Sequence, residues 1–318
     1  VLSAMGGGFY DRDVEVASSS AGYSASSTAA LSRSNQDPET KSLDQTLKFS
    51  NGTPIVIAVD VTGSMGDWPR IIYDKLPMFY GQLMMQKYLD NPAIAFAAFG
   101  DATCSAAPLQ VTPFAQRGDI DNWIKKLWLE GGGGPEPESY SMTSLFWANN
   151  TEFSDCSKPY FFITADAPYR DEVPVDHIRR HIDSGWERGA MSATDVYKLL
   201  QEKYHAFCLF RGAVGSPNHQ RWVKALGGEH VLVLNEAKAC VDVMLGAISI
   251  VAGARGMAEY MVDLDQRGQS EERKAAVQST LGALAAKAPA PAAAASEEER
   301  LKAELEAAKK ELAELKAS

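Results

Sequence analysis

The sequence predicts an α/β protein with a doubly wound, mostly parallel sheet and helices on both of its faces. Short apolar runs, typical of buried strands, alternate along the chain with amphipathic segments, which are typical of helices. This alternation continues over residues 53–256 and predicts one domain of this class. With 318 residues, 45% of them hydrophobic, the chain can bury one substantial core and still carry tails.

Five apolar runs are predicted to form buried strands, and one further run is predicted to lie at the edge of the sheet. The five buried runs share a continuous apolar composition and lie at residues 54–60, 93–99, 160–165, 205–210 and 230–235. Prolines bracket the weaker run at residues 108–114, and a proline cannot donate to a central ladder, so we expect an edge strand there.

Helical patterns fill the intervals between these runs. Pro69 suits the first turn of a helix that continues through residues 71–89, and Pro77 predicts a kink within it. The other predicted helices share an amphipathic or apolar pattern and lie at residues 119–129, 139–150, 193–204, 218–227 and 236–254.

Both ends of the chain are predicted to lie outside this domain. Residues 1–52 form a low-complexity arm rich in Ser, Ala and Gly, which we expect to be disordered unless a partner orders it. Residues 257–287 predict a helical extension, and residues 288–296 predict an Ala/Pro linker.

Residues 297–318 predict a short, coiled-coil-like helix. Its apolar seam repeats every three or four positions and consists of Leu301, Leu305, Ala308, Leu312 and Leu315. About two heptads are too few for a stable helix in water, so we expect a partner helix, with a frayed single helix as the alternative.

Charge and cysteine content exclude several classes of protein. The formal net charge of -10 argues against nucleic acid and against anionic membranes as partners, because both favour a basic surface. Four scattered cysteines predict reduced thiols, and neither a signal peptide nor a membrane-spanning run is visible. We therefore expect a soluble protein of the cytoplasm.

A D-x-T-x-S motif follows the first predicted strand, in PIVIAVDVTGSM. In an open parallel sheet, ligands bind at the carboxyl ends of the strands, and Asp60 lies at such an end. The spacing allows Asp60, Thr62 and Ser64 to turn three oxygen-bearing side chains toward one point. Carboxylate and hydroxyl oxygens are the ligands of Mg²⁺, with Mn²⁺ or Ca²⁺ as alternatives. A degenerate site, in which Asp60 only caps the following helix, is the competing interpretation.

This stretch resembles the first loop of the metal-ion-dependent adhesion site (MIDAS) in von Willebrand factor A domains, whose pattern is D-x-S/T-x-S. FFITADAPYR places Asp166 after a later strand, where that family carries its third-loop aspartate. The resemblance covers about two thirds of the chain. It implies a doubly wound α/β fold with an ion at the top of the sheet, held by Asp60, Thr62, Ser64 and Asp166.

The second loop of the family is matched less closely. EGGGGPEPESY is most similar to the intracellular subgroup that is joined to alpha-kinase domains, but Pro135 stands where that subgroup has an aspartate. Glu136 is therefore the candidate second-loop ligand. Trp68, Asp101 and Glu138 are expected at the rim that faces a partner, with a surface turn as the alternative role of Asp101.

The resemblance implies a protein-binding role and no catalysis: a carboxylate from a protein partner would complete the shell of the ion. We therefore expect an adaptor or assembly protein. The alternatives are a mainly structural subunit that uses its terminal segments and has a vestigial metal site, and, less favoured, a metal-dependent hydrolase. His177 and His181 lie one helical turn apart and could bind zinc, but the sequence shows no third ligand near them.

Overall fold

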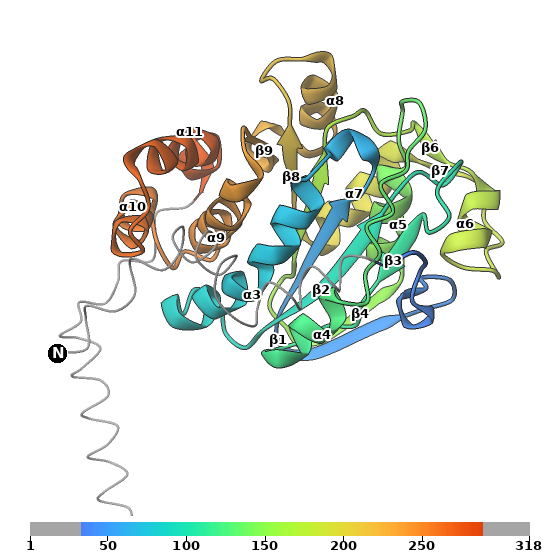
Figure 1. Ribbon diagram of the computed structural model, residues 1–318, viewed down its shortest axis with the longest axis horizontal. Coiled ribbons are helices and arrows are strands. Elements are labelled where there is room, and N and C mark those ends of the chain that lie inside the picture. The colour runs from blue at the N-terminus through green and yellow to red at the C-terminus, as the bar shows by residue number, and fades with distance from the viewer. Residues whose placement is uncertain (1–32, 289–318) are drawn as a thin grey trace, which may run out of the picture.

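The computed structural model describes residues 33–288 of the chain (Figure 1). The first 32 residues of the predicted arm, residues 289–296 of the predicted linker and the predicted coiled-coil helix with its seam lie outside the described residues.

A seven-stranded sheet forms the centre of the protein, with the path β3-β2-β1-β5-β8-β9. All neighbours on this path are parallel except β3, which runs antiparallel to β2, and β4 pairs in parallel with the first part of β1. The strands are β1 (Leu47–Asp60), β2 (Pro92–Phe99), β3 (Leu109–Val111), β4 (Thr151–Cys156), β5 (Tyr160–Ala165), β8 (His205–Arg211) and β9 (Val231–Leu234). This arrangement confirms the predicted fold class.

Helices cover both faces of the sheet, so successive residues of the central strands are buried on opposite sides. In β1, Ile57 and Val59 join one core, whereas Val56 and Ala58 join the other. This explains the continuous apolar runs in the sequence. One face carries α3 (Trp68–Gln86), α4 (Gly118–Ile124), α9 (Cys240–Val251), α10 (Met257–Gln266) and α11 (Glu271–Lys287). The other face carries α5 (Tyr140–Asn149), α6 (Val175–His181), α7 (Ala193–Lys203) and α8 (Pro217–Leu226).

Several element boundaries differ from the sequence predictions. The first strand begins at Leu47 and not at Pro54, because residues 47–52 pair with β4. Both segments are polar and half exposed, so neither shows the apolar signal of a buried strand. A small two-stranded sheet of β6 (Glu172–Val173) and β7 (Met191–Ser192) was likewise not predicted. The helix α3 runs through Pro77 without interruption.

The extension after the sheet packs onto the domain through α10 and α11. Leu264 and Leu281 are fully buried in the core between these helices and α9. Asp242 of α9 is also buried and forms ion pairs with Arg267 (3.3 Å) and Arg273 (3.2 Å) of the extension. None of the helices within residues 33–288 is both long enough and apolar enough to cross a membrane.

The order of the strands determines where a ligand can bind. From β1 the chain moves outward to β2 and β3, and it then returns to place β5 on the other side of β1. The carboxyl ends of β1 and β5 therefore flank the point at which the winding direction changes, which is the usual binding position in such sheets. Asp60 is the last residue of β1, and Asp166 follows the last residue of β5.

Candidate metal centre

The D-x-T-x-S loop folds around the carboxylate of Asp60. The Oδ1 atom of Asp60 accepts hydrogen bonds from the backbone N–H (2.8 Å) and the hydroxyl (2.7 Å) of Thr62. Because the Thr62 hydroxyl donates its one proton there, the Ser64 hydroxyl, at 3.0 Å, donates to Thr62. The N-cap of α3 is Asp67, so Asp60 does not cap this helix.

Three carboxylates meet at the carboxyl edge of the sheet. Asp60, Glu138 and Asp166 each place an oxygen within 4.8 Å of the other two. Asp60 and Glu138 are buried, and Asp166 is partly buried. Within residues 33–288, this is the one group of three or more His, Cys, Asp or Glu side chains close enough to share an ion. His177 and His181, whose ring centroids lie 6.4 Å apart, belong to no such group.

The second loop contributes Glu138 to this cluster and leaves Glu136 exposed. Glu138 is 4% exposed, and its Oε2 atom is buried without a hydrogen-bond partner. Its backbone is held along the third loop, because its N–H donates to the Pro168 carbonyl (2.9 Å) and its carbonyl accepts from the Arg170 N–H (3.0 Å). Glu138, expected at the rim, thus lies in the cluster, whereas Glu136, the candidate second-loop ligand, lies outside it. Glu138 directly precedes the buried segment that opens α5, whereas Glu136 stands between two prolines.

Tyr140 joins the two aspartates, and the sequence analysis did not identify it. Its hydroxyl donates to Asp60 Oδ2 (2.7 Å), lies 3.3 Å from Asp166 Oδ1 and accepts a hydrogen bond from the Asp166 N–H (3.4 Å). Burial, followed by the nearby carboxylates, raises the pKa of Tyr140 well above its usual value, so the hydroxyl remains a donor. The ring packs edge-on against Phe99 and Trp222. Tyr140 therefore holds Asp60 and Asp166 in position relative to each other from the buried side of the site.

The electrostatics of the cluster favour proton uptake or a cation. Burial raises the pKa of Asp60 to about 6, and the charge of Asp166 adds to this. Burial, followed by the charge of Asp60, raises the pKa of Glu138 to about 8. The cationic group that reaches the cluster within the described residues is Arg211, whose Nη1 atom lies 3.9 Å from Asp166 Oδ2. A divalent cation would favour the ionised form of all three carboxylates.

The donor atoms of the site fit a hard divalent cation. Glu138 lies beside two other carboxylates and has a buried Oε2 atom without a hydrogen-bond partner, and Asp60 Oδ2 accepts one hydrogen bond where it has capacity for two. The ligands are oxygen atoms, as Mg²⁺, Mn²⁺ and Ca²⁺ prefer. The loops also approach closely: the Gly63 N–H donates to the Gly132 carbonyl at 2.5 Å, and a Cβ atom on Gly63 would lie 3.0 Å from the Gly131 carbonyl oxygen.

The remaining rim candidates fall into different environments. Trp68 is partly buried at the start of α3, and the Arg211 guanidinium lies 5.3 Å from the centroid of its ring. Asp101 is completely buried, so it is not part of an exposed rim, but its carbonyl accepts from the Cys104 N–H (3.2 Å) and closes a turn in which Thr103 and Cys104 are exposed. Its Oδ2 atom accepts a hydrogen bond from Arg170 (2.8 Å), and its Oδ1 atom accepts one from the Thr103 N–H (2.7 Å).

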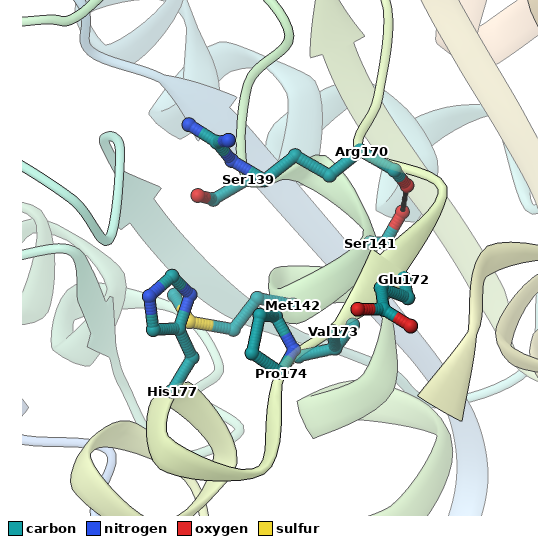
Figure 2. A pocket seen from close by; sticks show the side chains of 8 residues that line it. All are labelled: Ser139, Ser141, Met142, Arg170, Glu172, Val173, Pro174 and His177. Atoms are coloured by element: carbon teal, nitrogen blue, oxygen red, sulfur yellow. Dashed lines mark hydrogen bonds between the residues drawn. The ribbon is translucent and has the colours of Figure 1, made fainter. Parts of the chain in front are cut away.

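A small cleft lies beside the second loop. Figure 2 shows its lining, with the Arg170 guanidinium and His177 on one side and the Glu172 carboxylate on the other. The Ser141 hydroxyl donates to the Arg170 carbonyl (3.0 Å). The Ser139 hydroxyl accepts from the Ala102 N–H (3.0 Å), and among the described residues no hydrogen bond joins a serine of this cleft to His177.

Neither a known protein family nor a curated protein sequence matches the chain. Several solved structures show a distant likeness to the chain. The pilus adhesin SpaC from Lactobacillus rhamnosus GG, in its open conformation, aligns at 10% identity and a TM-score of 0.43, covering 66% of this chain and 31% of the adhesin. This chain thus spans about a third of the adhesin's length.

Two further solved structures align at similar levels. Proximal thread matrix protein 1 from the mussel byssus gives 13% identity and a TM-score of 0.41, covering 68% of this chain and 48% of that protein. The conserved hypothetical protein BatB from Bacteroides thetaiotaomicron gives 12% identity and a TM-score of 0.37, covering 68% of this chain and 100% of BatB. Likenesses at this level carry no argument about the function of this chain.

Proposed function

We propose that this protein is a module for cation-dependent protein binding, in which a MIDAS-like site binds Mg²⁺ and a carboxylate of a protein partner. The observation that carries the proposal is Glu138, whose Oε2 atom is buried without a hydrogen-bond partner and whose carboxylate lies within 4.8 Å of Asp60 and Asp166. An unsatisfied buried carboxylate oxygen costs stability, and a cation would compensate it. Asp60, Glu138, Asp166 and the exposed hydroxyl of Ser64 are the groups proposed to hold the ion.

The ion supplies an open coordination position that a partner's acidic side chain would fill. The residues of this chain would supply the remaining ligands of its coordination shell. Tyr140 orients Asp60 from the buried side, and Thr62 occupies Asp60 Oδ1, so Oδ2 is the oxygen that remains available toward the cluster. Ser64 and the partly buried Asp166 lie on the solvent side, where a partner could approach.

A substitution of Asp60 tests the metal site directly. In Asp60→Ala we expect the affinity for Mg²⁺, measured by titration calorimetry, to fall by about 100-fold or more, because a buried ligand is lost. The matched control is Asp67→Ala, which removes an exposed aspartate at the start of α3 whose side chain makes no capping hydrogen bond. Equal Mg²⁺ affinity in the wild type and in Asp60→Ala would contradict the proposal.

The same two variants separate this function from its alternatives. Complexes purified with the tagged wild-type protein should release their partner in EDTA, and Asp60→Ala should not retain it. A partner that stays bound in EDTA would instead support the structural role of the terminal segments. Turnover of phosphoester or peptide substrates by the Mg²⁺-loaded protein, lost in Asp60→Ala, would support the hydrolase.

We propose that the module acts inside the cell, since all four cysteines are free thiols.

A further inference from the structure

Arg211 lies at the rim of the acidic cluster and is held there from several directions. It is the last residue of β8, the strand next to β5. Its Nη1 atom donates to the Ser64 carbonyl and lies 3.9 Å from Asp166 Oδ2, while the guanidinium lies over the Trp68 ring at 5.3 Å from its centroid. These contacts fix a positive charge beside the site.

The guanidinium of Arg211 also remains open to a ligand. The side chain is 38% exposed, and within the described residues Nη1 is its one atom that donates a hydrogen bond. The other N–H groups of the fork are therefore available to a carboxylate, which a guanidinium can bind through two parallel hydrogen bonds. Because the ring of Trp68 and the Ser64 carbonyl already restrain the side chain, a ligand would bind at a smaller cost in side-chain entropy.

The charge of the cluster favours the presence of such a group where an acidic partner binds. Three ionised carboxylates outweigh a divalent cation by one negative charge, so the loaded cluster alone would repel a further carboxylate. The guanidinium of Arg211 cancels this excess. The ion and Arg211 thus form two neighbouring cations on one face.

We propose that Arg211 determines the specificity of the site for a protein segment with two neighbouring carboxylates. One carboxylate completes the shell of the ion, and the second is held by the guanidinium of Arg211 over Trp68. This inference rests on the proposed metal-dependent function, and it names the chemistry of the partner at that same site.

The test compares two arginines that both stack on a tryptophan. Arg211→Met removes the proposed anion contact, and Arg188→Met removes a guanidinium that lies 3.8 Å from the ring centroid of Trp186 and belongs to no contact of the cluster. Each protein is first titrated with Mg²⁺ alone. The Mg²⁺-loaded proteins are then titrated with blocked tetrapeptides that contain two adjacent aspartates, one aspartate and one asparagine, or two asparagines. Binding is followed by the NMR signal of the Trp68 indole N–H, which a Trp68→Phe variant identifies.

We expect Arg211→Met to bind Mg²⁺ as tightly as the wild type or more tightly, because a neighbouring positive charge is lost. Its affinity for the peptide with two aspartates should fall by about ten-fold, to the level of the peptide with one aspartate. Arg188→Met should match the wild type in both titrations.

The contrary outcomes are distinguishable. Unchanged peptide binding in Mg²⁺-loaded Arg211→Met would overturn the role of Arg211 and leave the proposed function intact. Loss of Mg²⁺ binding in Arg211→Met would show that Arg211 merely holds the Ser64 loop, which also overturns the inference. A wild-type protein that binds no Mg²⁺ would overturn the proposed function itself.

Discussion

The chain carries the pattern D-x-T-x-S twice, at residues 60–64 and at residues 101–105, at the carboxyl ends of two neighbouring parallel strands. Locally the two loops are alike. In each, the Oδ1 atom of the aspartate accepts hydrogen bonds from the backbone N–H and from the hydroxyl of the threonine: 2.8 and 2.7 Å at Asp60, 2.7 and 2.5 Å at Asp101. The motif alone therefore predicts the same local conformation for both.

The two loops differ in what the rest of the fold places opposite them. Asp101 faces the Arg170 guanidinium at 2.8 Å, whereas Asp60 faces the carboxylates of Glu138 and Asp166. Burial raises the pKa of Asp101, but hydrogen bonds from Thr103 and Arg170 outweigh this and lower it below its usual value. The pKa of Asp60 is raised. The aspartate of the loop at residues 101–105 thus has a cationic partner within the chain, the Arg170 guanidinium, whereas Asp60 has no such partner within residues 33–288. A D-x-T-x-S loop becomes a candidate metal site only where the fold leaves its charge uncompensated.

Removal of Arg170, the cationic partner of Asp101, should give the largest effect, which is on the free energy of unfolding. In Arg170→Met, the completely buried Asp101 loses its guanidinium partner, and we expect the free energy of unfolding in urea to fall by about 3–5 kcal/mol. The double variant Asp101→Asn with Arg170→Met should recover part of this loss, because no unpaired charge remains buried. A loss below about 1 kcal/mol in the single variant would contradict the comparison between the loops.

Substitutions of Glu138 and Glu136 should have smaller effects, and they test which of these two glutamates binds the ion. Glu138→Gln should weaken Mg²⁺ binding by about 10- to 100-fold, since a buried carboxylate ligand becomes an amide of the same shape. It should also stabilise the metal-free protein, because one buried acidic group is removed from the cluster. The matched control, Glu136→Gln, alters an exposed residue outside the cluster and should change neither property. If Glu136→Gln had the larger effect on calorimetric Mg²⁺ affinity, our assignment of the second-loop ligand would be wrong.

The dependence on pH should be the most gradual of these effects, because it is spread over about two pH units. Protons and Mg²⁺ compete for Asp60 and Glu138, whose pKa values are raised to about 6 and about 8, so Mg²⁺ affinity should increase between these pH values. The increase should be roughly ten-fold per pH unit for each proton that is released. In the metal-free protein the folded state holds more protons than the unfolded state, so its stability should fall as the pH rises through the same range.

Asp101 supplies the internal control for this pH dependence. Its pKa is lowered, so no change from the loop at residues 101–105 is expected between pH 6 and 8. Calorimetric titrations and urea unfolding across this range would check both statements. A pH-independent Mg²⁺ affinity would contradict the raised pKa of Glu138.

Some features of the fold could be predicted from the sequence because they depend on local pattern. The runs at 54–60 and 160–165 are apolar throughout, which indicates strands buried on both faces, and the structure contains β1 and β5 at these places. The first half of β1 could not be predicted in this way. Residues 47–52 are stabilised by pairing with β4, a segment distant in the sequence that is polar and half exposed.

Local sequence was therefore enough to predict the class of fold and to place Asp60 and Asp166 at the ends of buried strands, because a continuous apolar run marks each of these strands. The tertiary structure alone decided which side chains face them. It brought in Glu138 and not Glu136, added Tyr140 and Arg211, and gave Arg170 to Asp101. These choices depend on loops held side by side through backbone hydrogen bonds between distant segments, such as Glu138 to Pro168, and no short-range pattern encodes such pairing.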